Sequence, residues 1–139
     1  MKLVDVNVLV YAANQSSREH ESSRAWLSTA LSGDEAVGLP WVNLLAFIRI
    51  TTNRRIFAQP ITPAQALATV RAWLESPVAV APEPSIRHFE VLAAMIDRAG
   101  TAGNLTMDAH VAALAVEHQA EVVTFDRDLE RFGVEVVIP

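Results

Sequence analysis

Cysteine is absent from this 139-residue chain, so neither disulfide bonds nor thiolate-ligated metal sites can form. The sequence also lacks any apolar run of about 20 residues, the length that a helix needs to cross a bilayer. Its first residues do not show the basic, apolar and small-residue pattern of a signal peptide. We therefore expect a cytoplasmic protein with no membrane partner.

Lysine is almost absent as well, because Lys2 is the only lysine among the 11 basic residues and all the others are arginine. The net charge is -5, and an acidic protein does not on its face attract nucleic acid. Arginine, however, is well suited to bidentate contacts with phosphate. A GC-rich genome would give the same arginine bias, so composition leaves the partner open.

No internal repeat, low-complexity tract or long linker divides the chain. Hydrophobic residues make up 51% of it and charged residues 19%, which is typical of a compact domain and not of a disordered chain. A chain of this length buries roughly two thirds of its unfolded surface. We therefore expect one domain over residues 1–139.

Short apolar strands alternate with helices along the sequence. Capping-box patterns at Ser16–Glu19 and Thr62–Gln65 indicate two helix starts, and Gly100 indicates a helix end. This alternation predicts βαβ units in an α/β fold, with a central mainly parallel sheet of four to five strands flanked by helices. The expected strands are 2–6, 36–40, 78–81, 121–125 and 134–138; the expected helices are 7–13, 16–31, 41–53, one that starts at 62–65, 85–100 and 106–120.

Three aspartates from distant parts of the chain fall where strands end or helices begin. Asp5 interrupts the first apolar strand, Asp126 directly follows the fourth strand, and Asp108 lies in the first turn of the alanine-rich helix. Aspartate is favoured at helix starts for structural reasons alone. The joint pattern is more informative, because ligands of parallel sheets bind at the carboxyl ends of the strands.

Carboxylates gathered at one sheet edge need a partner. Two of them about 5 Å apart repel by roughly 3 kcal/mol at an effective dielectric of 20. Three together require either raised pKa values or a cation, and oxygen ligands without cysteine favour Mg²⁺ or Mn²⁺. Such a cation suits phosphodiester hydrolysis. This interpretation makes Asp5, Asp108 and Asp126 both the catalytic residues and the metal ligands.

The segments "VDVNVLVYA", "LLAFIRITTN" and "NLTMDAHVAALAVEHQAEVVTFDRDLERF" resemble PIN-domain ribonucleases, and most closely the VapC toxins of bacterial VapBC toxin–antitoxin pairs. The resemblance implies a PIN-like three-layer sandwich and a Mg²⁺- or Mn²⁺-dependent endoribonuclease, acting on tRNA or rRNA and inhibited by a VapB antitoxin. It also favours a homodimer. By resemblance, the family's acids fall on Asp5, Asp108 and Asp126, with Asn7 and Thr124 as supporting residues.

One acid of the family pattern is missing, because the usual glutamate falls on Ala46. At 100° per residue, Asn43, Arg49 and Asn53 form with Ala46 a narrow stripe on an otherwise apolar helix. That apolar circumference predicts a largely buried helix. The alternative function is therefore a PIN-fold module that binds RNA or an antitoxin with weakened or lost catalysis.

Other residues have both a functional and a structural interpretation. Arg49, Arg54 and Arg55 could contact RNA phosphates or simply occupy a solvated helix end. Asn104 could orient a ligand, and Asp128 could join the acids or be a surface charge. A third class, phosphatases or receiver domains with a strand-end aspartate, needs a lysine near the phosphoryl group. The only lysine, Lys2, lies at the start of the first strand and does not fit that role.

Overall fold

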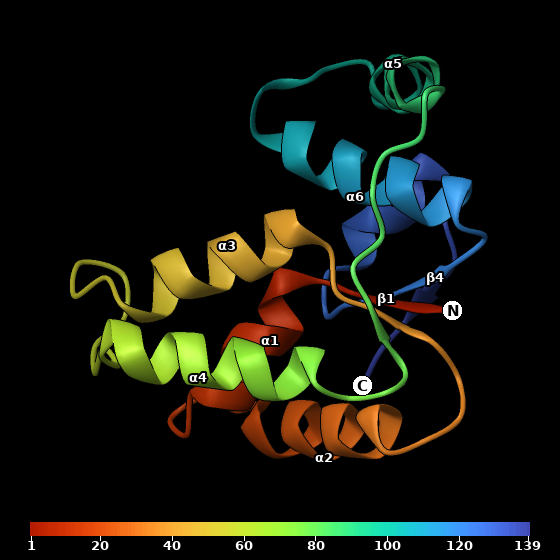
Figure 1. Cartoon of the computed structure of the whole chain (residues 1–139). Coiled ribbons are helices and arrows are strands. Elements are labelled where there is room, and N and C mark those ends of the chain that lie inside the picture. The colour runs from red at the N-terminus through yellow and green to blue at the C-terminus, as the bar shows by residue number, and fades with distance from the viewer.

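The computed structural model describes all residues from 1 to 139. Its helices and strands alternate along most of the chain (Figure 1). The strands are β1 (Lys2–Val4), β2 (Val37–Gly38), β3 (Ala79–Val80), β4 (Glu121–Val123) and β5 (Val136–Val137). The helices are α1 (Val6–Ala13), α2 (His20–Leu31), α3 (Trp41–Thr51), α4 (Pro63–Leu74), α5 (His88–Ala99) and α6 (Thr106–Glu117), with 3-10 helices η1 (Gly103–Leu105) and η2 (Arg127–Phe132).

The five strands form one sheet in the order β3-β2-β1-β4-β5. Every neighbouring pair is parallel, which confirms the predicted α/β class. In this order β1 lies in the centre and pairs with both β2 and β4. The carboxyl ends of β1 and β4 are therefore adjacent, as the interpretation of Asp5 and Asp126 requires.

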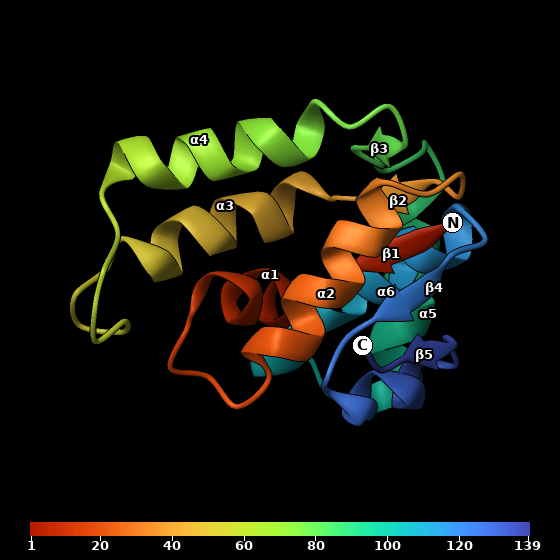
Figure 2. The same ribbon diagram turned by 90° about the horizontal axis from the view of Figure 1, so that it is seen from below.

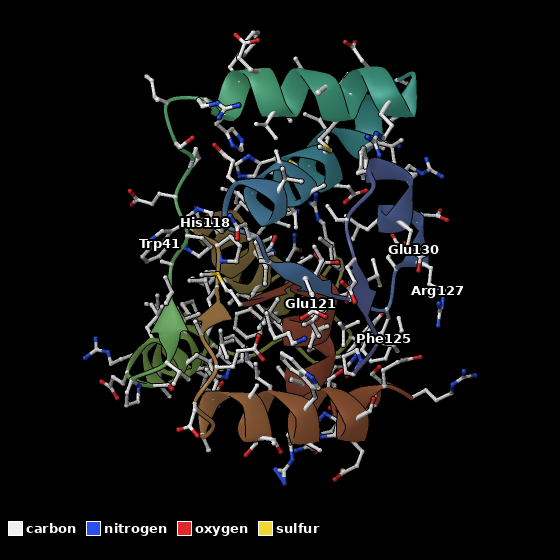
Figure 3. The ribbon with its side chains drawn as sticks, turned by 90° about the vertical axis from the view of Figure 1, so that its right-hand side faces the viewer. Trp41, His118, Glu121, Phe125, Arg127 and Glu130 are labelled. Carbon is white, nitrogen blue, oxygen red and sulfur yellow. The ribbon has the colours of Figure 1, made fainter.

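Alternation of side chains along the strands gives the sheet two apolar faces. Leu3 and Val122 pack into a core formed with α5, α6 and η2, whereas their neighbours Val4 and Val123 pack into a core formed with α1, α2, α3 and α4. Successive strand residues point to opposite faces, so a buried run of β-branched and aliphatic residues covers both. Figure 3 shows the three layers, with α5 and α6 on one side of the sheet and α2 on the other.

The α3–α4 pair extends beyond the sheet at the end where β1 finishes (Figures 1 and 2). Phe47 of α3 and Trp73 of α4 hold the two helices together with ring centroids 4.8 Å apart. Thr62 and Gln65 form the predicted capping box at the start of α4, with Pro63 in the first turn. Gly100 ends α5 with a left-handed φ of 72°, a conformation that glycine adopts without a Cβ penalty.

Two predictions about the helices are wrong. The Ser16–Glu19 capping box does not form: α2 begins at His20, and Ser17 instead bonds to the backbone and carboxylate of Glu19. Helix α3 is not largely buried, because Trp41 and Leu45 are 49% and 59% exposed. Apolar composition around the whole helix did not distinguish the residues that face the core from those exposed to solvent.

Candidate active site

Asp5 lies at the junction between β1 and α1. Its backbone N–H continues the pairing with β4 by donating to the Val123 carbonyl at 3.0 Å. Its side chain caps α1, since Oδ1 accepts a hydrogen bond from the Val6 N–H at 2.6 Å. The residue is only 8% exposed, and a buried carboxylate needs such partners.

Asn7 and Thr124 lie against the other oxygen of this carboxylate. Oδ2 of Asp5 accepts from Asn7 Nδ2 at 2.8 Å and from Thr124 Oγ1 at 2.7 Å. Asn7 Oδ1 accepts in turn from the Phe125 N–H, and Thr124 Oγ1 from the Asp126 N–H. These bonds tie the end of β1 to the end of β4 and hold the Asp5 carboxylate in one orientation.

Asp108 and Asp126 approach Asp5 from two other elements. Asp108 is half-buried in the first turn of α6. Asp126 is exposed and caps η2, where its Oδ1 accepts from the Asp128 N–H at 2.8 Å. Asp128 itself is exposed and lies 3.7 Å from the guanidinium of Arg131.

Burial and mutual repulsion both act on these acids. Burial raises the pKa of Asp5; hydrogen bonds from Thr124 and Val6 oppose the rise, and the charge of Asp126 adds to it. Burial also raises the pKa of Asp108, and the negative charges of Asp5 and Asp126 raise it further. The charge of Asp126 therefore disfavours the ionised forms of both Asp5 and Asp108, and the charge of Asp5 adds to the effect on Asp108.

A cavity of about 420 Å³ opens beside Asp5 and Asp108. Both acids line it together with residues from α3, among them Ala46 and Arg49. Arg49 is exposed and takes part in no ion pair. The other lining residues are Val6, Val42, Asn43, Leu45, Ile50, Met107 and Val111.

The donor set fits a hard divalent cation in its chemistry, because the candidate ligands are the carboxylate oxygens of Asp5, Asp108 and Asp126 and the chain has no cysteine thiolate. As the side chains stand, no group of three or more aspartate, glutamate or histidine residues lies close enough to hold a metal ion. The structure thus brings Asp5 and Asp108 to one cavity and Asp126 within electrostatic reach, but it does not show a closed ligand shell.

Comparison with known proteins places this arrangement in a family. The family model of the PIN domain matches residues 2–135. Ribonuclease VapC37 of Mycobacterium tuberculosis is 48% identical over 132 residues, which are 95% of this chain and 92% of that protein. The chain belongs to the VapC group of PIN-domain proteins.

Solved structures of VapC proteins share its fold. Mycobacterium tuberculosis VapC20, described as a sarcin-ricin loop cleaving toxin, has a TM-score of 0.73 at 17% identity, with both chains fully covered. VapBC2 of Rickettsia felis, solved bound to a DNA fragment from its promoter, has a TM-score of 0.72 at 14% identity, with 99% of this chain and 97% of that chain covered.

In this VapC protein the α3 stripe faces the acids over part of its length. Asn43, Ala46 and Arg49 line the cavity, so the Ala46 methyl group faces the space that Asp5 and Asp108 also line. Asn53 does not join them and instead accepts a hydrogen bond from the Arg55 N–H. Arg54 and Arg55 are exposed in the loop after α3, and Asn104 is exposed in η1; none of these three lines the cavity.

Sequence reasoning missed one buried contact of the VapC site. Asn43 is 3% exposed, and its Nδ2 donates to the Val4 carbonyl at 2.9 Å. This bond attaches α3 to the residue before Asp5 and thereby fixes the distance between the α3 wall and the acid. The polar stripe on α3 was a signal that Asn43 faces the site, but a partner 39 residues away has no local signature.

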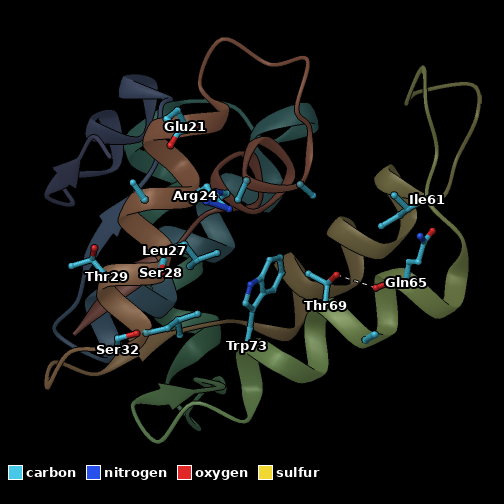
Figure 4. A pocket seen from close by; sticks show the side chains of 15 residues that line it. Glu21, Arg24, Leu27, Ser28, Thr29, Ser32, Ile61, Gln65, Thr69 and Trp73 are labelled. Carbon is cyan, nitrogen blue, oxygen red and sulfur yellow. Dashed lines mark hydrogen bonds between the residues drawn. The ribbon is translucent and has the colours of Figure 1, made fainter.

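A second and larger hollow lies away from the acids. It measures about 1010 Å³ and separates α2 from α4, with α1 at its base. Figure 4 shows Arg24 and Leu27 of α2 on one side and Thr69 and Trp73 of α4 on the other. None of the aspartates discussed above lines it.

Proposed function

We propose that this VapC-type chain is a Mg²⁺- or Mn²⁺-dependent endoribonuclease that hydrolyses RNA phosphodiester bonds, with tRNA or rRNA as its target, and acts as the toxin of a type II toxin–antitoxin pair. The observation that carries the proposal is the cavity where Asp5 and Asp108 meet the unpaired Arg49. Membership in a group whose member VapC37 is named a ribonuclease supports it.

Each residue has a distinct role in this proposal. Asp5, Asp108 and Asp126 would hold the cation, which would activate water and neutralise charge developing on the phosphate. Asn7 and Thr124 hold the Asp5 carboxylate in place through the bonds described above. Arg49, at the open side of the cavity, would bind a phosphate of the RNA as a planar, always charged donor.

The test is cleavage of purified tRNA and rRNA by the purified chain in Mg²⁺ or Mn²⁺. We expect cleavage to stop in chelator and to fall at least about 100-fold in Asp5→Asn or Asp108→Asn, since a removed ligand weakens both metal binding and water activation. Asp34→Asn is the matched control, because Asp34 is exposed and lines neither large cavity. Cleavage that persists in chelator would contradict the proposal.

Ala46 favours one alternative, a PIN-fold module that binds RNA or antitoxin with weakened or lost catalysis. The methyl group leaves the α3 wall of the cavity without a charged ligand. In that case the wild-type chain would bind RNA without cleaving it, and Asp108→Asn would show the same lack of cleavage.

We also propose that a VapB-type antitoxin covers the hollow between α2 and α4. Its lining is half apolar and includes exposed alanines on both helices, so an amphipathic helix could bury them. Ala68→Arg should reduce co-purification with the VapB-type antitoxin expected from the neighbouring gene. Ala64→Arg is the control, because Ala64 is exposed on the same helix but does not line the hollow.

A homodimer is the proposed oligomeric state. Trp41, at the start of α3, is 49% exposed and lines neither large cavity, and burial of such a side chain favours association. Light scattering after size exclusion should give twice the chain mass for the wild type, and Trp41→Glu should shift the chain toward the monomer.

A further inference from the structure

The cavity beside the acids is more apolar than hydrolysis alone requires. Seven of its eleven lining residues are hydrophobic, and they come from three elements. Leu45 of α3 and Met107 of α6 are 59% and 52% exposed. A cation and a phosphate would use only the polar part of this space, where Asp5, Asp108 and Arg49 lie.

Ala46 is the reason that the α3 wall is apolar. A carboxylate at this position would put a negative charge among Val42, Leu45 and Ile50, whereas the methyl group leaves this part of the α3 wall uncharged beside Arg49. Met107 lies on the α6 side of the same cavity, and its unbranched thioether adapts to flat ligands. The volume of about 420 Å³ is within the range of small-ligand pockets.

We propose that this cavity binds an unstacked nucleobase of the RNA substrate, next to the phosphate held by the acids and Arg49. The base places its apolar faces against Ala46, Leu45 and Met107. Such a base is available in single strands and loops, whereas a paired base must first leave its stack at a cost of a few kcal/mol. The proposal rests on the proposed ribonuclease function and restricts its substrate to unpaired nucleotides.

Charge complementarity selects this occupant over an apolar protein segment. The cavity joins an apolar wall to Arg49, which has no ion-pair partner. A nucleotide carries both matching parts, an aromatic base and an adjacent phosphate. An aliphatic side chain from a second copy or from an antitoxin would contact the apolar wall but would leave the Arg49 guanidinium without an anionic partner.

The experiment compares nucleoside 5′-monophosphates with ribose 5-phosphate, which lacks only the base, in Mg²⁺. Binding is followed by calorimetry and by the Met107 methyl signal in NMR. We expect at least one of the four nucleotides to bind about tenfold more tightly than ribose 5-phosphate and to shift the Met107 signal. Equal affinity for the nucleotides and ribose 5-phosphate overturns the proposal.

Two variants test the cavity itself. Ala46→Leu fills the space and should abolish the preference for nucleotides over ribose 5-phosphate; Ala64→Leu, on an exposed part of α4, should keep that preference. If Ala46→Leu lowers the melting temperature too far for binding studies, Met107→Ala removes an opposing wall and should reduce the preference. If folded Ala46→Leu, or Met107→Ala in its place, still binds nucleotides as selectively over ribose 5-phosphate as the wild type does, the proposal is overturned.

The two proposals fail separately. RNA cleavage without a nucleotide preference leaves the ribonuclease function intact and overturns the base site. A nucleotide preference without RNA cleavage supports the base site and contradicts the ribonuclease function. If the Met107 signal instead shifts with protein concentration and nucleotides have no effect, a second copy occupies the cavity and the base site is overturned.

Discussion

Asp5 lies at the end of the central strand and is only 8% exposed. Burial of a carboxylate at such a position costs free energy. Three hydrogen bonds from Val6, Asn7 and Thr124 reduce that cost. Burial nevertheless keeps its pKa above the ordinary value. Removing a neighbouring charge should therefore stabilise the metal-free fold, whereas a bound cation should stabilise the intact site.

Asp108→Asn tests this balance. Without divalent metal at pH 7, we expect the variant to melt about 2 °C above the wild type, a modest gain because Asp108 is partly screened by solvent. Burial is the main cause of the raised pKa of Asp108, and the charges of Asp5 and Asp126 add to it. The ionised form therefore destabilises the fold at pH 7, and this cost disappears as the pH falls below the ordinary value of 3.8. The difference should vanish there.

Mn²⁺ provides the complementary measurement on the same proteins. Ligand binding to the folded state raises the melting temperature, so the wild type should gain stability with Mn²⁺ and Asp108→Asn should gain much less. Asp34→Asn should behave as the wild type. Equal stabilisation of all three proteins by Mn²⁺ would show that Asp108 does not contact the ion.

Ala46→Glu tests the missing acid. The substitution puts a carboxylate into the cavity that Asp5 and Asp108 line, so Mn²⁺ should bind about tenfold more tightly, the usual size of effect for residues around a metal. Calorimetry measures the affinity, and Ala64→Glu controls for added charge. A parallel rise in RNA cleavage would identify the natural chain as catalytically weakened; unchanged Mn²⁺ affinity would place residue 46 away from the ion.

Helix α6 carries Asp108 at its start and is anchored to α5 along its length. The anchor is a cluster of Ser85, His88, His110 and Glu117. His88 Nδ1 lies 2.5 Å from the Glu117 carboxylate and its Nε2 lies 2.8 Å from His110 Nδ1, while Ser85 bonds to the other Glu117 oxygen. Because His110 and Glu117 are seven residues apart on one helix face, their bonds to a single histidine fix both the rotation and the axial position of α6.

Glu117→Gln should therefore lower the stability of the fold in a pH-dependent way. Burial raises the pKa of Glu117, but hydrogen bonds from Ser85 and His88 outweigh it and hold the pKa below its ordinary value of 4.5. A lowered carboxyl pKa contributes stability above the unfolded value and loses it as the pH falls through the folded value. The variant should be less stable by roughly 1.5 kcal/mol at pH 7 and equal to the wild type in strong acid.

Denaturant unfolding at several pH values measures this difference. Glu90→Gln, on an exposed position of α5, is the control and should show no comparable loss. A deficit of Glu117→Gln that stays constant down to pH 3 would mean that the contact is one of packing, not of charge.

Elements with local signatures could be predicted, and those set by distant partners could not. The Thr62–Gln65 capping box and the Gly100 helix end each depend on a few adjacent residues, and both are confirmed. The Ser16–Glu19 pattern failed because Ser17 competes for the same glutamate. The bonds of Asn43 to Val4 and of His88 to Glu117 join segments 39 and 29 residues apart, and no local pattern encodes them.

Sheet order decides which of the predicted acids meet. A parallel sheet with β1 between β2 and β4 brings Asp5 beside Thr124, 119 residues away, and the sequence indicated this only through the strand-end positions of the acids. The same topology places α3, and with it Ala46 and Arg49, across the cavity from α6. The alternation of strands and helices predicted the architecture; the depth and apolar lining of the cavity depend on how α3 and α6 pack.

The charge of the whole molecule bears on how it could bind RNA. At a net charge of -5 the chain as a whole repels a polyanion, so attraction must be local. Arg49, Arg54 and Arg55 are exposed and form no ion pairs, and they follow α3 from the acid-lined cavity to the loop beyond it. Each phosphate contact to a single strand should contribute about 0.7 to the slope of log affinity against log salt.

Fluorescence anisotropy in the presence of chelator measures the affinity for a labelled single-stranded RNA between about 50 and 200 mM salt. The slope of log affinity against log salt should be near -2, because roughly three phosphate contacts contribute about 0.7 each. Arg54→Ala and Arg55→Ala should each reduce the slope by about 0.7. Arg71→Ala should leave it unchanged, because Arg71 is exposed near the other end of the α3–α4 pair. A slope that none of these arginines alters would show that RNA binds elsewhere on the molecule. A wild-type slope steeper than -2 that Arg71→Ala also reduces would indicate nonspecific attraction of RNA to scattered arginines. The net charge of -5 opposes such attraction.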